Sequence, residues 1–149
     1  MPMLLRRDRA MLAVSIMLDV AFHAGRAATV SAAELSERLG LARRGMEPLL
    51  QSLSRAGLLE SVRGPRGGYR LGRSRRDISL ADIVGVAGEA EAGEGPHGAL
   101  QAQVIDPVWR EMDGVVSERL AATTLEDLLR RAAAAGLRRP MTEPISFAI

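Results

Sequence analysis

Apolar residues in the first part of the chain recur every three to four positions, the spacing of one face of an α-helix. Residues 8–24 form the first such segment. Residues 32–39 form the second, and the preceding Ser31 with Glu34 three positions later is typical of a capping box. Residues 43–56 form the third. The pattern therefore predicts three successive helices joined by short connections.

Pro48 affects where the third helix can begin. A proline in a helix interior costs about 3 kcal/mol, whereas in the first turn its missing N–H would have no helical partner anyway. This argument favours a start near Arg44 or Gly45. The apolar side chains expected to face the core from this helix are Met46, Leu49, Leu50 and Leu53.

After Gly57 the pattern changes to that of a β-hairpin. Residues 58–62 and 69–71 have the composition of short strands, and residues 63–68 between them contain three glycines and one proline. Helix, capped helix, turn, helix and hairpin, in this order, are the plan of a winged helix-turn-helix. In that plan the third helix enters the major groove of DNA, and the hairpin, or wing, lies on the adjacent backbone.

Further helices are predicted beyond the hairpin. Asp77 or Ser79 can cap a short helix, and the segment rich in Gly, Ala and Glu that follows it is expected to form a loop. A wide apolar stripe then predicts a long helix, in which Asp106-Pro107 either caps a new start or introduces a kink. Thr124 opens the last predicted helix.

These elements define a fold that is mainly α-helical with a small β-hairpin wing. We expect a winged helix-turn-helix domain in residues 1–84 and a loop in residues 85–98. The long helix and the last helix are expected within residues 99–136, and residues 137–149 form a tail.

Charge is unevenly divided between the two halves of the chain. Residues 1–78 contain 14 arginines and 7 acidic residues, whereas residues 79–149 contain 6 arginines and 11 acidic residues. A basic half joined to an acidic half indicates that one half binds a polyanion. Arg63 and Arg66 on the wing, and Arg75 just beyond it, are candidates for contacts with DNA phosphates.

The composition also excludes several kinds of site. Because the chain has no cysteine, it forms no disulfide and no thiolate metal site. The sequence has no motif of a catalytic triad, a phosphate-binding loop or a two-histidine metal helix, so we expect neither an enzyme nor a cofactor. The apolar run after Arg6-Arg7 ends at Asp19 and is too short to cross a membrane, so we expect a cytoplasmic protein.

Several segments resemble a known family. Val62-Arg-Gly-Pro-Arg-Gly-Gly-Tyr-Arg-Leu71, preceded by Leu53-Ser-Arg-Ala-Gly-Leu-Leu59, is similar to the wing sequence of the Rrf2 family of transcriptional regulators, which includes the IscR- and NsrR-like proteins. Ser79-Leu-Ala-Asp-Ile-Val84 and Thr123-Thr-Leu-Glu-Asp-Leu128 resemble later segments of the family. The resemblance spans about residues 4–130 and implies a homodimer on a near-palindromic operator.

The resemblance also implies roles for individual residues. Ala42, Arg43 and Arg44 would lie at the groove-facing start of the recognition helix, where either arginine can bond to a guanine. The corresponding residues on the wing would be Arg63, Arg66, Gly67 and Tyr69. The long helix would pair with its counterpart in a second subunit through Val104, Val108, Trp109, Met112, Val116 and Leu120.

The sequence departs from the family in the loop. Many relatives hold an iron–sulfur cluster with three cysteines there, whereas residues 89–98 of this chain contain none. Asp8 matches an acidic residue that helps to bind the cluster in some members, and His97 is the histidine of the loop. One carboxylate and one imidazole do not replace thiolates, so the resemblance is to cysteine-free members that work without a cluster.

The sequence therefore predicts a DNA-binding transcriptional regulator, more readily a repressor than an activator, that binds double-stranded DNA as a homodimer. Two alternatives remain open at this point. One is a winged-helix module that binds a protein instead of DNA, and the other is a regulator that responds to an unidentified small-molecule effector. The strongly basic N-terminal half favours DNA.

Overall fold

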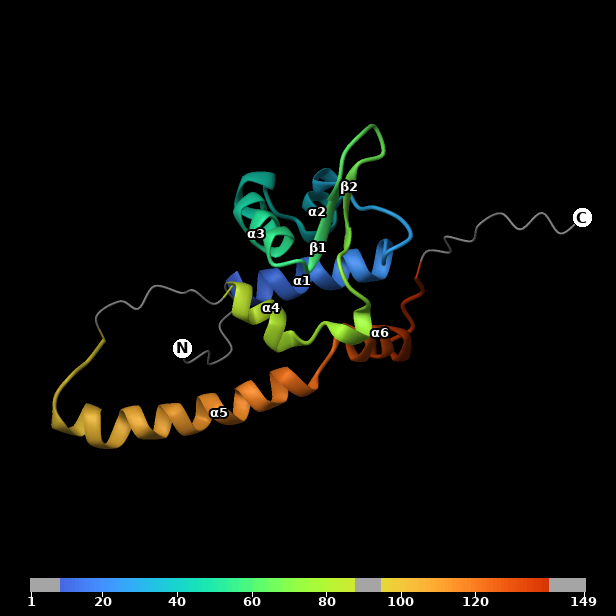
Figure 1. Cartoon of the computed structure of the whole chain (residues 1–149). Coiled ribbons are helices and arrows are strands. Elements are labelled where there is room, and N and C mark those ends of the chain that lie inside the picture. The colour runs from blue at the N-terminus through green and yellow to red at the C-terminus, as the bar shows by residue number, and fades with distance from the viewer. Residues whose placement is uncertain (1–8, 88–94, 140–149) are drawn as a thin grey trace, which may run out of the picture.

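Helix α1 (Arg9–His23) forms the centre of the N-terminal domain in the computed structural model, which describes residues 9–87 and 95–139 (Figure 1). Three other helices and one strand of the hairpin pack against it. Burial of its apolar face stabilises the fold by about 25 cal/mol per Å² removed from water. The buried residues of α1 recur at helical spacing and are Ala10, Ala13, Ile16, Met17, Val20 and Ala21.

Helix α2 (Ala32–Leu39) is closed at both ends by residues that the sequence singles out. At its start the Ser31 side chain accepts a hydrogen bond from the Glu34 N–H. At its end Gly40 has a φ of 67°, the left-handed conformation that glycine adopts at no steric cost. The chain then turns directly into α3, so α2 and α3 form the predicted helix-turn-helix.

Helix α3 (Arg43–Arg55) begins before the positions favoured by Pro48. Because Arg43 is the first helical residue, Pro48 lies in the second turn, and its missing N–H leaves the carbonyl of Arg44 without the usual helical donor. Arg44 and Pro48 are both exposed, so water can reach this part of the helix. The helix thus starts one residue before Arg44, as the predicted range 43–56 has it, because an exposed turn tolerates the missing bond.

Strands β1 (Leu59–Val62) and β2 (Gly68–Leu71) form the predicted antiparallel hairpin. A short bridge ties this hairpin to the loop before α2. The Val30 N–H donates to the Tyr69 carbonyl over 2.8 Å, and the Tyr69 N–H donates to the Val30 carbonyl over 2.7 Å. The wing is therefore attached to the helix-turn-helix by backbone hydrogen bonds as well as by its own chain ends.

Beyond the hairpin, a short 3₁₀ turn η1 (Arg75–Asp77) leads into helix α4 (Leu80–Ala87). Of the two expected caps, Ser79 is the one used, because its hydroxyl accepts from the Asp82 N–H and its own N–H donates to the Asp82 carboxylate. The loop expected to begin at residue 85 begins later, since Ile83 and Ala87 bury one face of the last turn of α4.

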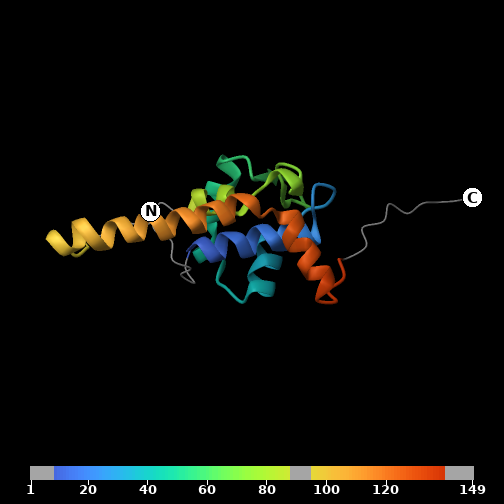
Figure 2. The same cartoon turned by 90° about the horizontal axis from the view of Figure 1, so that it is seen from below.

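The predicted long helix is present as α5 (Asp106–Ala122), preceded without a break by a π-helical segment, η2 (Gln101–Ile105). The Asp106 N–H bonds to the carbonyl of Gln101, five residues back. This wider turn precedes Pro107, which has no N–H to donate, and the helix continues through it. Figures 1 and 2 show α5 extending far beyond the N-terminal domain, and within the described chain none of its residues is buried.

Helix α6 (Leu125–Ala134) returns to the N-terminal domain and packs against α1 through the buried residues Leu125 and Leu129. A capping box between Thr124 and Asp127 defines its start. In the part of the chain that the structure describes, no helix is both long and apolar enough to span a lipid bilayer. The observed architecture is the predicted winged helix-turn-helix with a long additional helix.

Gly68 lies where the backbone of Val30 passes closest to the wing. A Cβ atom at Gly68 would lie 2.4 Å from the Val30 carbonyl oxygen and 2.7 Å from its carbon, distances that real Cβ contacts do not reach. Both neighbours are backbone atoms, so the clash cannot be relieved by turning a side chain. The bridge between Val30 and Tyr69 therefore requires glycine at this position.

We predict that Gly68→Ala lowers the free energy of unfolding by about 1–3 kcal/mol, the range for overpacked sites. Urea unfolding followed by circular dichroism measures this change. Gly85→Ala is the matched control, because a Cβ at Gly85 meets nothing within 4 Å and the residue is helical. The control should be neutral or stabilising by up to about 1 kcal/mol. Equal stability of parent and Gly68→Ala would show that the bridge is dispensable.

Candidate DNA-binding surface

Helix α3 has one buried and one exposed face, and its exposed face begins with two arginines. The buried face consists of Met46, Leu49, Leu50 and Leu53, as expected from the sequence. On the other face Arg43, Arg44 and Glu47 are exposed. The N-terminal turn of α3 is therefore accessible, and a helix of this kind can enter the major groove of DNA.

Ala42 is the N-cap residue of α3, and its methyl side chain offers no hydrogen bond to the first N–H groups. Most helices have Ser, Thr, Asp or Asn at this position. The unpaired N–H groups and the positive end of the helix dipole favour an anion here. Arg43 and Arg44 add two positive charges at the same place, so this turn is suited to a DNA phosphate or a guanine edge.

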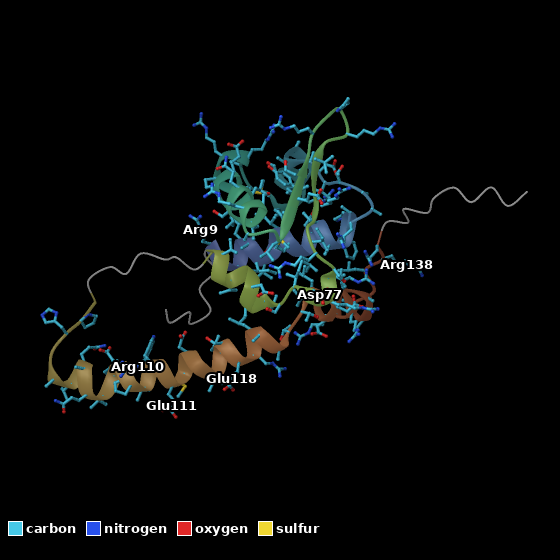
Figure 3. All side chains as sticks on the ribbon, in the orientation of Figure 1. Arg9, Asp77, Arg110, Glu111, Glu118 and Arg138 are labelled. Carbon is cyan, nitrogen blue, oxygen red and sulfur yellow. The ribbon has the colours of Figure 1, made fainter. Side chains whose placement is uncertain are left out.

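The tip of the wing is a tight, exposed turn with two more arginines. The Gly67 N–H donates to the Gly64 carbonyl over 2.8 Å, and Arg63 and Arg66 are both exposed. Figure 1 shows the hairpin rising beside α2 and α3, with its tip pointing away from α5 and α6. Figure 3 shows side chains extending outward from the wing tip and from α3 on this side of the domain. The four arginines of α3 and the wing can therefore act on one ligand.

Thr29 positions the wing and was not identified from the sequence. Its hydroxyl donates to the carbonyl of Arg66 over 2.8 Å, one residue before the bridge formed by Val30. The bond fixes the backbone at the residue whose side chain is expected to meet phosphate. A polar residue directly before Val30 is the only sequence feature that marks this role, and the pattern does not indicate its partner.

Gly67 and Tyr69 serve the internal structure of the wing. A Cβ at Gly67 would lie 2.5 Å from the Val62 carbonyl oxygen, so glycine is needed to close the turn. Tyr69 is half-buried and packs against the hydrophobic core. The closure of the turn alone therefore accounts for the glycine at position 67.

Two other arginines near this surface are paired within the protomer. Arg38 forms two hydrogen bonds with Asp19, of 2.9 and 2.8 Å, and joins α2 to α1. Arg70 forms two with Glu60 across the hairpin, of 3.2 and 3.0 Å. The bond from Arg70, followed by its charge, lowers the pKa of Glu60. These arginines stabilise the fold, and their charge is largely balanced locally.

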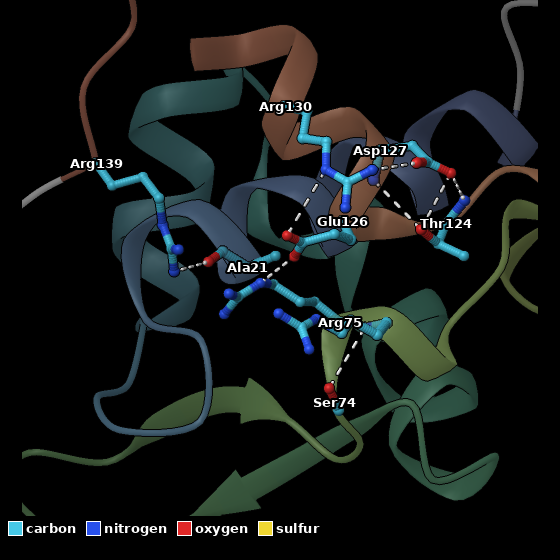
Figure 4. Close-up of polar contacts among 9 residues, drawn as sticks. Ala21, Ser74, Arg75, Thr124, Glu126, Asp127, Arg130 and Arg139 are labelled. Carbon is cyan, nitrogen blue, oxygen red and sulfur yellow. Dashed lines mark hydrogen bonds and ion pairs between the residues drawn. The ribbon is translucent and has the colours of Figure 1, made fainter.

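Arg75 differs from the other arginines predicted to contact DNA. Its Nε donates to the Glu126 carboxylate of α6, and its side chain is 38% exposed (Figure 4). The hydrogen bond from Arg75 lowers the pKa of Glu126, and the charges of Arg75, Arg76 and Arg130 add to this effect. The Arg75 side chain thus joins η1 to α6 and does not lie with the arginines of α3 and the wing.

Helix α5 and its π-helical start expose a long apolar face. Of the six residues predicted to form a dimer interface, Val104, Val108, Trp109 and Met112 are between 42% and 50% exposed, whereas Val116 and Leu120 are half-buried. The packing of α5 against α4 accounts for partial burial near its C-terminal end. Three further exposed apolar residues of the predicted stripe are Leu100, Ile105 and Val115.

The residues present do not fit an iron–sulfur cluster. The chain has no cysteine, and the described residues contain no group of three or more His, Cys, Asp or Glu side chains that could hold a metal ion. His97 is exposed. Asp8 and loop residues 88–94 lie outside the described residues. Clusters of this kind are usually held by thiolates, and this chain has none.

Comparison with known proteins agrees with the geometry. The transcriptional regulator IscR of Vibrio atlanticus is 36% identical over 123 residues, which are 79% of this chain and 70% of that protein. The solved structure of T. potens IscR has a TM-score of 0.74 and 32% identity, and the match covers 92% of this chain and 94% of that one. CymR, described as the global cysteine regulator of B. subtilis, has a TM-score of 0.70 and 29% identity over 87% of this chain and 98% of its own.

The family model that matches the chain is that of Rrf2, described as an iron-dependent transcriptional regulator, and the match covers residues 7–131. Its relatives regulate transcription and are not enzymes. The basic start of α3, the wing and the long helix thus belong to one recognised architecture. The chain is a member of the Rrf2 family of DNA-binding transcriptional regulators, without the cysteines that a thiolate-bound cluster requires.

Proposed function

We propose that the protein is a homodimeric, sequence-specific regulator that represses transcription by occupying a near-palindromic operator. The observation that carries this proposal is the grouping of Arg43, Arg44, Arg63 and Arg66 on two exposed elements that lie side by side. A symmetric pair of such surfaces matches an inverted repeat with half-sites about one helical turn of DNA apart. A bound dimer of this kind excludes other proteins from the same DNA.

Within each half-site the two elements have different tasks. The N-terminal turn of α3 enters the major groove, where Arg43 or Arg44 can bond to O6 and N7 of a guanine. Arg63 and Arg66 on the wing neutralise phosphates and fix the orientation of the domain. The small side chain of Ala42 leaves room for the DNA backbone at the start of α3. Arg75 is omitted from this interface because it is bonded to Glu126.

Dimerisation through α5 follows from the apolar face described above. Seven large apolar residues from Leu100 to Val115 are each at least 42% exposed. A monomeric protein seldom exposes a contiguous apolar patch of this kind unless it is an interface. Pairing of two such helices buries this face and holds two domains at a fixed spacing, as a palindromic site requires. Because bacterial DNA lies in the cytoplasm, the protein would act there.

A protein partner in place of DNA is the second function considered. The four exposed arginines and the uncapped helix start would have to meet an acidic protein surface. Nothing in the described surface favours such a partner over DNA, which presents regularly spaced phosphates. DNA therefore remains the proposed ligand.

Arg66→Ala should weaken binding to every duplex, because a phosphate contact is independent of sequence. The slope of log K against log salt concentration should fall by about one for each subunit. Fluorescence anisotropy of a labelled duplex at several salt concentrations measures both changes. Arg131→Ala, an exposed arginine on α6, removes the same charge elsewhere and should leave the slope unchanged. An unchanged slope for Arg66→Ala would exclude this contact.

Arg44→Ala should change base preference more than overall affinity. Loss of a bidentate arginine–guanine contact costs about 1–3 kcal/mol at one base pair of each half-site. Selection of bound sequences from random duplex DNA, carried out with parent and variant, measures this loss. The variant should no longer prefer guanine at one position of each half-site. The same selection with Arg43→Ala shows which of the two arginines contacts the base. Identical motifs for parent and both variants would contradict this part of the model.

Met112→Glu should dissociate the dimer, because it places an unpaired carboxylate in an apolar interface. We expect the dimer dissociation constant to rise about a hundredfold or more, as measured by light scattering after size exclusion. Ser117→Glu adds the same charge at an exposed position more than one turn further along α5, away from the apolar stripe, and serves as control. If the parent is a monomer at micromolar concentration, the dimer model fails.

A further inference from the structure

A basic cavity lies on the α6 side of the N-terminal domain, outside the proposed DNA-binding surface. It measures about 270 Å³ and is lined by residues from three separate segments. Gly25 and Arg26 come from the loop after α1, Ser74 and Arg75 come from η1 and the residue before it, and Arg139 follows α6. Three arginines therefore meet at one cavity although they are far apart in sequence.

Two of these guanidinium groups are held in place by hydrogen bonds within the protomer. Arg139 donates through Nη2 to the Ala21 carbonyl over 3.1 Å, and the same nitrogen lies 3.7 Å from where a Cβ on Gly25 would stand. Arg75 donates through Nε to Glu126. Figure 4 shows both side chains approaching the same region from opposite sides. An arginine has five N–H donors, so one anchoring bond leaves several for a ligand.

The charge around the cavity is not balanced by its lining. Among the described residues that line it, none is acidic, whereas three are arginines. Two carboxylates outside the lining interact with them: Glu126 accepts the bond from Arg75, and Glu60 interacts electrostatically with Arg26. The hydrogen bond from Arg75, and then the charges of Arg75, Arg76 and Arg130, lower the pKa of Glu126. Glu60 is also bonded to Arg70, so the positive charges around the cavity still exceed the negative ones.

We propose that this cavity binds a small, doubly charged oxyanion of the phosphate class, free in solution. Arginine forks match the oxygen geometry of phosphate and are weakly hydrated, so they suit a partly enclosed anion site. Ser74 adds a hydroxyl at the same lining. A phosphate group fits within the measured volume and leaves space for a small organic substituent.

The position of the cavity distinguishes a free anion from the DNA backbone. Figure 3 places Asp77 of η1 and Arg138 beside α6, at the opposite end of the domain from the wing tip. Contact of α3 and the wing with one duplex leaves this end of the domain facing away from that duplex. The ligand is therefore expected to be a soluble phosphate compound and not a second stretch of DNA backbone.

The loop that lines the cavity is also the loop that holds the wing. The Gly25 carbonyl accepts a hydrogen bond from the Leu71 N–H over 2.8 Å. Four residues later Thr29 bonds to Arg66 at the wing tip. An anion bound between Arg26 and Arg139 would join this loop to the end of α6 and change the mobility of the wing. This effect on DNA binding rests on the proposed function, whereas binding of the anion does not.

Titration calorimetry with inorganic phosphate, in the absence of DNA and at constant ionic strength adjusted with chloride, tests the site directly. The parent should bind phosphate, and Arg139→Gln and Arg26→Gln should each weaken it about tenfold, the effect of one lost charge-assisted hydrogen bond. Arg138→Gln is the matched control, since it removes the same charge from the neighbouring residue, which does not line this cavity. Its affinity should stay within about twofold of the parent.

If the parent does not bind phosphate, the proposed site is wrong. It is also wrong if all three variants weaken phosphate binding equally, because the anion would then respond to the overall positive charge and not to this cavity. Arg26 and Arg139 are exposed, so their variants should fold, and far-ultraviolet circular dichroism verifies this. If phosphate does not bind but Arg66→Ala still weakens DNA binding, the anion site fails and the proposed function stands. If Arg26→Gln and Arg139→Gln lower the salt dependence of DNA binding without phosphate present, the cavity contacts DNA instead and the inference is wrong.

Discussion

The two hydrogen bonds between Val30 and Tyr69 are the interaction on which the arrangement of this surface depends. They join the loop before the helix-turn-helix to the returning strand of the wing, so that two segments distant in sequence keep a fixed relative position. Only a residue without a side chain allows the two backbones this close, and Gly68 supplies it. Without this attachment, the wing would be a two-stranded hairpin, which is marginally stable on its own.

Arginine serves two purposes in this chain, and the structure separates them. Arg38, Arg70 and Arg75 each bond to a carboxylate of the same protomer and join neighbouring elements. The arginines of α3 and the wing tip lie on exposed turns with their charge directed outward. A guanidinium paired with a carboxylate contributes little net attraction to DNA. A count of basic residues therefore overstates the positive charge that is available to bind DNA. Position relative to acidic neighbours decides which arginines are available.

The local features of the sequence predicted most of the fold. Capping residues, glycines and apolar periodicity placed the helices and the hairpin, because these features act through neighbouring residues. The differences arose where contacts between distant segments decide the structure. The end of α4, beyond the expected start of the loop at residue 85, depends on burial that the sequence does not state. The bond from Thr29 to Arg66 and that from Arg75 to Glu126 join residues 37 and 51 positions apart, so local patterns contain no sign of them.

The uncapped start of α3 has a consequence for how the recognition helix behaves in solution. Since the Ala42 side chain provides no acceptor, the amide groups of Arg43 and Arg44 bond to water in the free protein, whereas the Gly45 N–H bonds to the Ala42 carbonyl. Such amides exchange their hydrogens rapidly and the first turn frays easily. An incoming phosphate oxygen would take the place that a serine or aspartate side chain occupies in other helices. Association with DNA would then complete the folding of the turn that makes the contact, and the ordering of that turn would become part of the recognition energy.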